Sequence, residues 1–407
     1  MNNSPLEFLS KKYGNIVKYD AAGNVAGIFV KFPKMKSSDL VAGLPERTHP
    51  AFKINGVEQD YILLGKYKAG ENGVSGGALV SAPNIMPARS LGADQCLSRM
   101  KAAGTGITGM TVADYGFIKL LAQKEGWVPK GNTYWGQSHK DATAWEVGKT
   151  LTVGTVRGYE GWRYECLIAH TTAAELKPDI APTYWKKLDF VGGVSRDTSV
   201  DAAHQTGYRT LNGTGPLDWY LGNDPGNLAD IIGSSLEQQY GYRIVGMELQ
   251  ILEDNNAADP SADLSASSAA WKAILPNASD DGYTLVAPGT AGTLHWRWAN
   301  GKITLDTTIT EEEMDGQYRG TNFKDLAYNA TNLPYIPSIV KELGLFPTDS
   351  NDKTEGYYYI HMTAAERFPR RGGHCNNPSF AGLGFVYAFY ERGDAGTGYG
   401  CRPRSLP

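Results

Sequence analysis

The residues best suited to recognising another molecule lie in one tract near the end of the sequence. Three segments frame this tract: RRGG at 370–373, the apolar run AGLGF at 381–385 and YGCRP at 399–403. Tyrosine offers a large, stiff, amphipathic ring at low entropic cost, while glycine and aspartate adjust shape and hydrogen bonding. This composition predicts non-covalent binding of a partner. The candidate ligand-binding residues are His374, Asn376, Asn377, Phe380, Tyr387, Phe389, Tyr390, Asp394, Gly396, Gly398 and Tyr399.

Residues that could catalyse a reaction are scattered along the chain. The seven histidines form no HxxxH or HExxH pair, and there is no GxSxG, Walker-type or GxGxxG motif. Asp349, Asn351 and Asp352 form a weak oxygen-ligand cluster, which is more typical of a solvated loop than of a calcium site. We therefore predict a protein that is not an enzyme and that uses no metal and no cofactor.

Charge and hydropathy argue against two further classes of partner. The 407 residues carry a net charge of −4, with no basic stretch long enough to follow a nucleic-acid backbone. No run of about 18 apolar residues is present, so we expect no membrane insertion. The first residues, MNNSPLEFLSKKYG, lack the apolar core of a signal peptide. The four cysteines show no metal-type spacing and are expected to be buried free thiols: Cys96, Cys166, Cys375 and Cys401.

The elements that must position the C-terminal tract are short strands and short helices. Thr111 and Asp114 predict a capping box at the start of a helix that ends near Gly126, and Asp94 can cap an earlier helix. Because strand side chains alternate, Tyr387 and Phe389 should share one face. The fold class predicted is α+β, with short helices and antiparallel strands. Hairpins or strands are expected at 15–32, 50–70, 240–252, 283–305, 357–362 and 381–393, and helices at 93–103, 111–126 and 335–343.

The RRGG and GCR segments resemble the C-type-lectin fold of the formylglycine-generating-enzyme-like group. In that group RGG followed by an aromatic residue begins the last strands, and GFR ends them. Here Cys375 stands where the aromatic residue is usual, and GCR at 400–402 replaces GFR. The stretch NLADIIGSSLE at 227–237 resembles the G-x-x-D-L-x-G-N-V-W-E signature of the group, with Ser234 for Asn and Leu236 for Trp. The resemblance implies a C-type-lectin-like domain over 41–137 and 192–407.

More narrowly, the tract resembles the variable proteins of diversity-generating retroelements, among them phage tail proteins that bind host receptors. In such proteins adenine rewriting of AAC codons never yields Lys, Gln, Met or Trp, and the window 374–399 contains none of these. Glu391 cannot arise from AAC, so we expect it to be a framework position. The resemblance implies a variable face at 374–399 on a phage tail-tip protein, made in the host cytoplasm and carried on the virion. The implied partners are a host surface protein or glycan, other phage tail proteins and further copies of the chain, a trimer being favoured.

Residues 138–191 resemble a small chitin-binding-type carbohydrate-binding module inserted in the main domain. Its candidate sugar-stacking residues are Trp145, Trp162, Tyr164 and Trp185. The alternative is that these large rings form the core of the unit, because about fifty residues need large aromatic side chains to be stable. Residues 1–40 are expected to form a β arm for attachment or oligomerisation, the alternative being the first hairpin of the main domain.

Two other functions are open at this point. A bacterial surface adhesin could carry the same diversified fold, although the sequence shows no signal peptide. A lectin-fold oxidase of the formylglycine-generating type would need two cysteines shortly after the glycine pair. Only Cys375 stands there, and Cys401 precedes Arg402 rather than following it.

Overall fold

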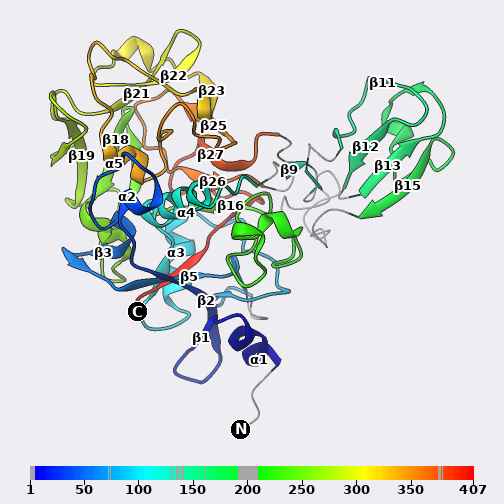
Figure 1. Cartoon of the computed structure of the whole chain (residues 1–407), viewed down its shortest axis with the longest axis horizontal. Helices are drawn as coiled ribbons and strands as arrows, with labels where there is room; N and C mark the ends of the chain where they lie inside the picture. The colour runs from blue at the N-terminus through cyan, green and yellow to red at the C-terminus, as the bar shows by residue number, and fades with distance from the viewer. Residues whose placement is uncertain are drawn as a thin grey trace.

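The computed structural model describes residues 5–71, 73, 75–129, 132–133, 137–138, 142–160, 162–190, 210–374, 377 and 379–407. Over these residues the fold is mixed α and β, rich in strands and poor in helices, with mostly antiparallel sheets (Figure 1). The predicted mixture of short helices and antiparallel strands is confirmed at this level. The α-helices are α1 (Pro5–Lys12), α2 (Ser37–Leu40), α3 (Ala93–Lys101), α4 (Val112–Lys124) and α5 (Ser338–Glu342).

The first sheet brings the end of the described chain back to its beginning. In spatial order its strands are β6 (Ala69–Glu71), β7 (Leu79–Ser81), β2 (Val25–Pro33), β5 (Tyr61–Gly65), β29 (Pro403–Ser405) and β8 (Ile107–Gly109), and β1 (Ile16–Tyr19) pairs with β2. The strand β2 is mostly buried because it lies between β7 and β5. The N-terminal hairpin expected to be an attachment arm is therefore part of the body from β2 onward, which corrects the boundary at residue 40.

The second sheet carries the C-terminal tract. In order its strands are β23 (Tyr318–Asn322), β25 (Tyr357–His361), β27 (Gly382–Ala388), β26 (Arg370–Gly372), β16 (Leu236–Gln238) and β28 (Tyr399–Gly400). The β25–β27 and β16–β28 pairs are parallel, and the other three are antiparallel. This sheet therefore unites segments that are far apart in the sequence.

A third sheet and a short hairpin confirm the predicted Asn-Gly turns. The third sheet runs β20 (Tyr283–Val286), β19 (Trp271–Pro276), β18 (Glu248–Leu252), β21 (His295–Ala299), β22 (Lys302–Asp306) and β24 (Ala327–Tyr328), with β17 (Tyr242–Val245) on β18. Asn300 and Gly301 have φ values of 52° and 74°, and Asn55 and Gly56 have 50° and 76°, between β3 (Lys53–Ile54) and β4 (Val57–Glu58). Two consecutive positive φ angles are the signature of a type I′ hairpin turn.

The helix α4 is buried in the body. Its predicted capping box is confirmed, since the Asp114 N–H donates to Thr111 Oγ1 at 3.1 Å and the Thr111 N–H donates to Asp114 Oδ2 at 2.9 Å. Gly116 permits close packing on α5, because a Cβ there would lie 2.1 Å from the Glu342 carbonyl oxygen. The helix α3 departs from expectation. Its N-cap is Gly92, and Asp94 lies within the first turn, where it pairs with Arg392 at 3.1 Å.

A buried group of three charges joins the first two sheets. Glu237 accepts from Arg402 Nη2 at 2.8 Å and lies 3.0 Å from Lys68 Nζ, and all three side chains are at most 1% exposed. Arg402 Nε also donates to Glu237, and the Nη1 and Nη2 groups of Arg402 donate to backbone carbonyls of 65–66 and 229–230. Charges removed from water persist only when they are paired and hydrogen-bonded. This charged group therefore holds residues near 68, 237 and 402 in one arrangement.

Residues 142–190 form a small unit with its own sheet and core, to one side of the other described residues (Figure 1). Its sheet has the order β12 (Val156–Tyr159), β13 (Trp162–Cys166) and β15 (Trp185–Phe190), beside the pair β11 (Thr150–Leu151) and β14 (His170–Thr171). The pair β9 (Asn132–Thr133) and β10 (Gln137–Ser138) precedes it. Among the described cysteines, Cys96, Cys166 and Cys401 are buried free thiols as predicted. Cys375 lies outside the described residues.

Candidate functional site

One face of the second sheet is lined with aromatic side chains. In β25, Tyr357, Tyr359 and His361 are half-buried, whereas the intervening Tyr358 and Ile360 are fully buried. Successive strand side chains point to opposite faces, so the first three share the outer face and the other two enter the core. The repeat of two in this strand thus separates a core face from a recognition face.

The register of the neighbouring strands extends the aromatic face on both sides. Parallel pairing places Tyr359 of β25 beside Tyr387 of β27. On the other edge, antiparallel pairing places Tyr318 beside His361 and Gly320 beside Tyr359. A Cβ at Gly320 would lie 2.2 Å from the Tyr357 ring, so the absence of a side chain there leaves room for this ring.

The rings touch one another in a continuous patch, which we name the aromatic platform. Its central contacts are Tyr359 with Tyr357 at 4.4 Å and Tyr359 with Phe389 at 5.3 Å between ring centroids. Tyr318, on the edge strand β23, contacts Phe389 with 4.6 Å between the ring centroids. Aromatic pairs at these separations contribute more to stability than their buried area alone predicts. The platform consists of Tyr318, Tyr357, Tyr359, His361, Phe380, Tyr387, Phe389, Tyr390 and Tyr399.

Three platform tyrosines, Tyr359, Tyr387 and Tyr399, keep their hydroxyl protons at neutral pH. Burial, helped by the nearby Tyr357, raises the pKa of Tyr359 to about 12. Burial also raises the pKa of Tyr387 and of Tyr399, and the neighbouring Tyr390 adds to both shifts. These phenols are therefore neutral, and they offer ring faces and O–H donors to a ligand.

A buried arginine supports the end of the platform nearest β28. The Arg370 guanidinium lies 4.1 Å from the centroid of the Tyr399 ring and 5.7 Å from that of Tyr390. Its Nη2 donates to the Asp394 carbonyl oxygen at 2.8 Å. Arg370 thus fixes two platform rings and the loop between them, and a face held rigid loses little entropy when it binds.

The glycine pair before the tract makes a turn that other residues could not adopt easily. Gly372 and Gly373 have φ values of 84° and 79°. A Cβ at Gly373 would lie 2.6 Å from the Ala381 Cβ, and one at Gly372 would lie 2.7 Å from the Ile231 carbonyl oxygen. The pair therefore satisfies both the left-handed backbone and the close approach of 231 and 381.

The structure places the predicted ligand-binding residues in different settings. Those that contribute rings to the platform are Phe380, Tyr387, Phe389, Tyr390 and Tyr399. His374 and Asn377 are half-buried in a turn in which the His374 N–H donates to Asn377 Oδ1 at 2.8 Å. Asp394 is exposed, but its carboxylate accepts the Glu391 N–H at 2.7 Å and so shapes the loop. Asn376 lies outside the described residues.

The two predicted glycines contribute shape rather than contact surface. Gly396 is half-buried, and a Cβ there would lie 2.6 Å from the Tyr399 ring. Gly398 is buried, which corrects its assignment to an exposed face. A larger residue at 396 would displace the Tyr399 ring.

Four platform residues come from outside the predicted tract: Tyr318, Tyr357, Tyr359 and His361. A signal for three of them exists in the sequence, since YYYIH places them at alternate positions of a predicted strand. Nothing in the sequence indicates that this strand lies beside residues 382–388, because parallel neighbours are set by tertiary contacts.

The candidate sugar-stacking residues of the 142–190 unit are mostly its core. Trp145, Tyr164 and Trp185 are 6%, 4% and 3% exposed, so their faces cannot stack on a ligand. Trp162 is half-buried, with Lys187 Nζ 3.5 Å from its ring centroid. The expectation of a stacking surface is therefore corrected for the first three residues. A unit this small buries its largest rings because few other side chains can form its core.

Trp185→Ala is expected to unfold the 142–190 unit, whereas Trp162→Ala is expected to leave it folded. Loss of a buried tryptophan side chain costs about 3–5 kcal/mol, and the half-buried Trp162 contributes less. Proteolysis followed by mass spectrometry would measure the effect, with new cleavage sites confined to 142–190 in Trp185→Ala. Equal protease resistance of the two variants would contradict this assignment of the core.

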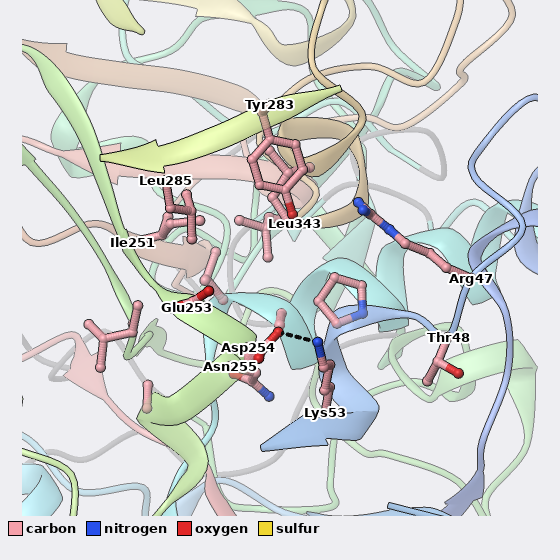
Figure 2. Close-up of a pocket in the computed structure, with 17 residues that line it drawn as sticks. Arg47, Thr48, Lys53, Ile251, Glu253, Asp254, Asn255, Tyr283, Leu285 and Leu343 are labelled. Atoms are coloured by element: carbon pink, nitrogen blue, oxygen red, sulfur yellow. Dashed lines mark ion pairs between the residues drawn. The ribbon is translucent and has the colours of Figure 1, made fainter. Parts of the chain in front are cut away.

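A second hollow, a cavity of about 150 Å³, lies away from the aromatic platform (Figure 2). Figure 2 shows Tyr283 and Arg47 above the ion pair of Lys53 and Asp254, whose atoms are 2.7 Å apart. Arg47 in turn pairs with the buried carboxylate of Glu342. Both cations that line this cavity, Arg47 and Lys53, already have anionic partners within the chain. Among its described lining residues, the cavity therefore offers no unpaired cation to a ligand, and the platform rings are the stronger candidate for a binding site.

The oxygen-rich loop at 349–354 is organised by internal contacts. The buried Asp352 pairs with Lys119 and accepts the N–H groups of Thr348 and Thr354, both at 3.0 Å. Burial alone would raise the pKa of Asp352, but Lys119 and these donors hold it below its usual value. Within the described ranges, no group of three or more His, Cys, Asp or Glu side chains is placed to hold a metal ion.

Comparison of the sequence with models of known protein families gives no match, and comparison with the curated proteins gives none either. In the part of the chain that the structure describes, no helix is both long and apolar enough to cross a membrane.

Proposed function

We propose that this protein is a receptor-binding protein of a phage tail tip, which recognises a ligand on the host surface through the aromatic platform. The observation that carries the proposal is the platform itself, a continuous set of partly exposed rings on a rigid sheet. Residues that bind partners are commonly loop or surface side chains displayed by such a scaffold. Aromatic side chains are also the residues most enriched among binding hot spots.

The proposed scaffold is a C-type-lectin-like fold. The segments that carry the resemblance contact one another, since Glu237 at the end of 227–237 is hydrogen-bonded to Arg402 of GCR. The RRGG segment supplies β26, which lies between β16 and β27. These contacts support the proposal because the resembling motifs form one structural unit rather than separate matches.

The proposed variability of 374–399 is compatible with the packing of β27. Tyr387 and Phe389 project onto the platform, while Val386 and Ala388, on either side of Tyr387, are fully buried. A change on the outer face alters the ligand contacts and leaves the core residues in place. Because these two rings are half-buried, replacing one is expected to cost about 1–2 kcal/mol of stability while the core residues stay in place.

Binding is proposed to be non-covalent, without turnover of the ligand, and multivalent. Several copies on one virion, arranged as a trimer together with other tail proteins, would add avidity of about 10²- to 10⁴-fold to a modest affinity at each site. The ligand is proposed to be a host surface protein or glycan.

Tyr387→Ala and Tyr390→Ala are expected to reduce binding of the purified protein to host cells by about ten-fold or more, because each removes a platform ring. Binding of labelled protein to the bacterial strain that the wild type recognises would measure this effect. Tyr335→Ala is a matched control, because this tyrosine is 47% exposed and outside the platform. Unchanged binding by both platform variants would reject the site. Unfolding of both would show that these rings belong to the core.

A further inference from the structure

A small cleft lies at the edge of the aromatic platform, beside Phe380. Its volume is about 200 Å³, and it is open to solvent. Phe380 is 37% exposed and packs edge-on against Tyr357, with 5.1 Å between the ring centroids. The residues that line the cleft are Asn322, Lys324, Thr354, Glu355, Gly356, Ser379 and Phe380.

Close backbone packing makes the floor of the cleft rigid. Gly356 has a φ of 135°, and a Cβ there would lie 2.2 Å from the Phe385 nitrogen. A Cβ at Gly382 would lie 2.3 Å from the Glu355 carbonyl oxygen, and the Gly384 N–H donates to that oxygen at 2.7 Å. The cleft therefore exists before any ligand arrives, which lowers the entropic cost of binding.

The rim of the cleft offers polar groups of several kinds. Lys324 is exposed, and within the described residues its ammonium group has no hydrogen bond and no ion pair. Asn322 is exposed, and its Nδ2 donates to Asp325 Oδ2 at 2.9 Å, so its amide oxygen is the group left for a ligand. The Ser379 hydroxyl is exposed on the opposite segment. A cation, the acidic residue Glu355, an amide acceptor and a hydroxyl thus line a hollow beside two aromatic rings.

We propose that this cleft is a subsite for an acidic sugar residue of a host surface polysaccharide. The sugar ring packs against Phe380 and Tyr357, its carboxylate lies beside Lys324, and its hydroxyl groups bind Asn322 and Ser379. This inference rests on the proposed function and specifies its ligand class. A sugar is favoured over a peptide because ring faces, hydrogen-bond donors and hydrogen-bond acceptors all lie around the hollow, and a sugar presents hydroxyl groups on every side of its ring.

The test compares trigalacturonate, an acidic trisaccharide, with the neutral maltotriose, by titration calorimetry and ligand-observed NMR on the full chain. We expect trigalacturonate to bind more tightly and its affinity to fall as salt is added, because Lys324 is exposed and screened by ions. Lys324→Gln should weaken the binding of trigalacturonate about three- to five-fold, the range expected for an exposed ion pair. The same substitution should remove the dependence of this affinity on salt. Phe380→Ala should weaken it about ten-fold.

Lys302→Gln is the matched control, since Lys302 is an exposed lysine of β22 in the third sheet. Equal binding of the acidic and neutral sugars, or wild-type binding by Lys324→Gln, would overturn the inference. Equal binding of triglutamate would show a general carboxylate site instead of a sugar site. If trigalacturonate fails to bind while host-cell binding still depends on Tyr387 and Tyr390, the subsite is wrong and the proposed function stands. If trigalacturonate binds while the platform variants bind cells normally, the proposed function fails.

Discussion

Glu237→Gln is expected to lower the free energy of unfolding by about 3–5 kcal/mol, because it leaves two buried cations without their anion. Lys68 and Arg402 both pair with Glu237, at 3.0 Å and 2.8 Å, and none of the three side chains reaches solvent. Glutamine has nearly the same shape as glutamate, so the stability lost in this variant reports the effect of the charge and not of altered packing. Urea denaturation followed by tryptophan fluorescence would measure the change.

Glu46→Gln is the control for Glu237→Gln, because it removes the charge of an exposed glutamate instead of a buried one. Glu46 pairs with Lys36 at 2.9 Å, but the two side chains are 78% and 51% exposed. Solvent screens such a pair, so the substitution should change stability far less than Glu237→Gln does. A loss from Glu237→Gln as small as that from Glu46→Gln would show that the buried group of charges does not hold the fold together.

The same group of charges predicts how stability depends on pH. Burial alone would raise the pKa of Glu237, but Arg402 and Lys68 outweigh burial and hold the pKa below its ordinary value of 4.5. A carboxylate whose pKa is lower in the folded state contributes its full stabilisation above the ordinary value and loses it as pH falls through the folded pKa. The wild type should therefore lose more stability than Glu237→Gln when the pH is lowered below about 4.5.

Tyr359→Ala is expected to weaken ligand binding by about 30-fold, more than any single change within 374–399, because its ring is the centre of the platform. The Tyr359 ring contacts Tyr357, Phe380, Tyr387 and Phe389, with centroid separations from 4.4 to 5.9 Å. Removal of the Tyr359 ring therefore takes away packing contacts from four other platform residues at once. Titration against the purified host ligand, or labelled binding to host cells, would measure the loss.

Two comparisons separate loss of contact from loss of folding. Tyr359→Phe keeps the ring and should retain most of the binding, because the ring rather than the hydroxyl holds the platform together. Tyr359→Ala should cost about 1–2 kcal/mol of stability, as expected for a half-buried ring. Wild-type affinity in a folded Tyr359→Ala variant would mean that ligand contacts are confined to the tract 374–399.

Features that depend on a few neighbouring residues could be predicted from the sequence. Asn300-Gly301 and Asn55-Gly56 adopt the predicted turns because their positive φ angles suit few other residues. The capping box at Thr111 forms because its partner Asp114 is one helical turn away. The outer positions of Tyr387 and Phe389 follow from the repeat of two residues in a strand. Local geometry decides each of these features.

Features that depend on distant partners could not be predicted in this way. Parallel pairing of β25 with β27 brings Tyr357 and Tyr359 to the C-terminal tract, and no local signal marks that register. Packing within the 142–190 unit places Trp185 inside it, although an aromatic residue on a small β unit suits either a core or a binding face. The pairing of β29 with β5 and β8 depends likewise on strands far away in the chain. Residue type and spacing thus indicated which side chains could bind a ligand. Only the long-range packing, which sets the register and buries apolar surface, determined which of them share the exposed platform.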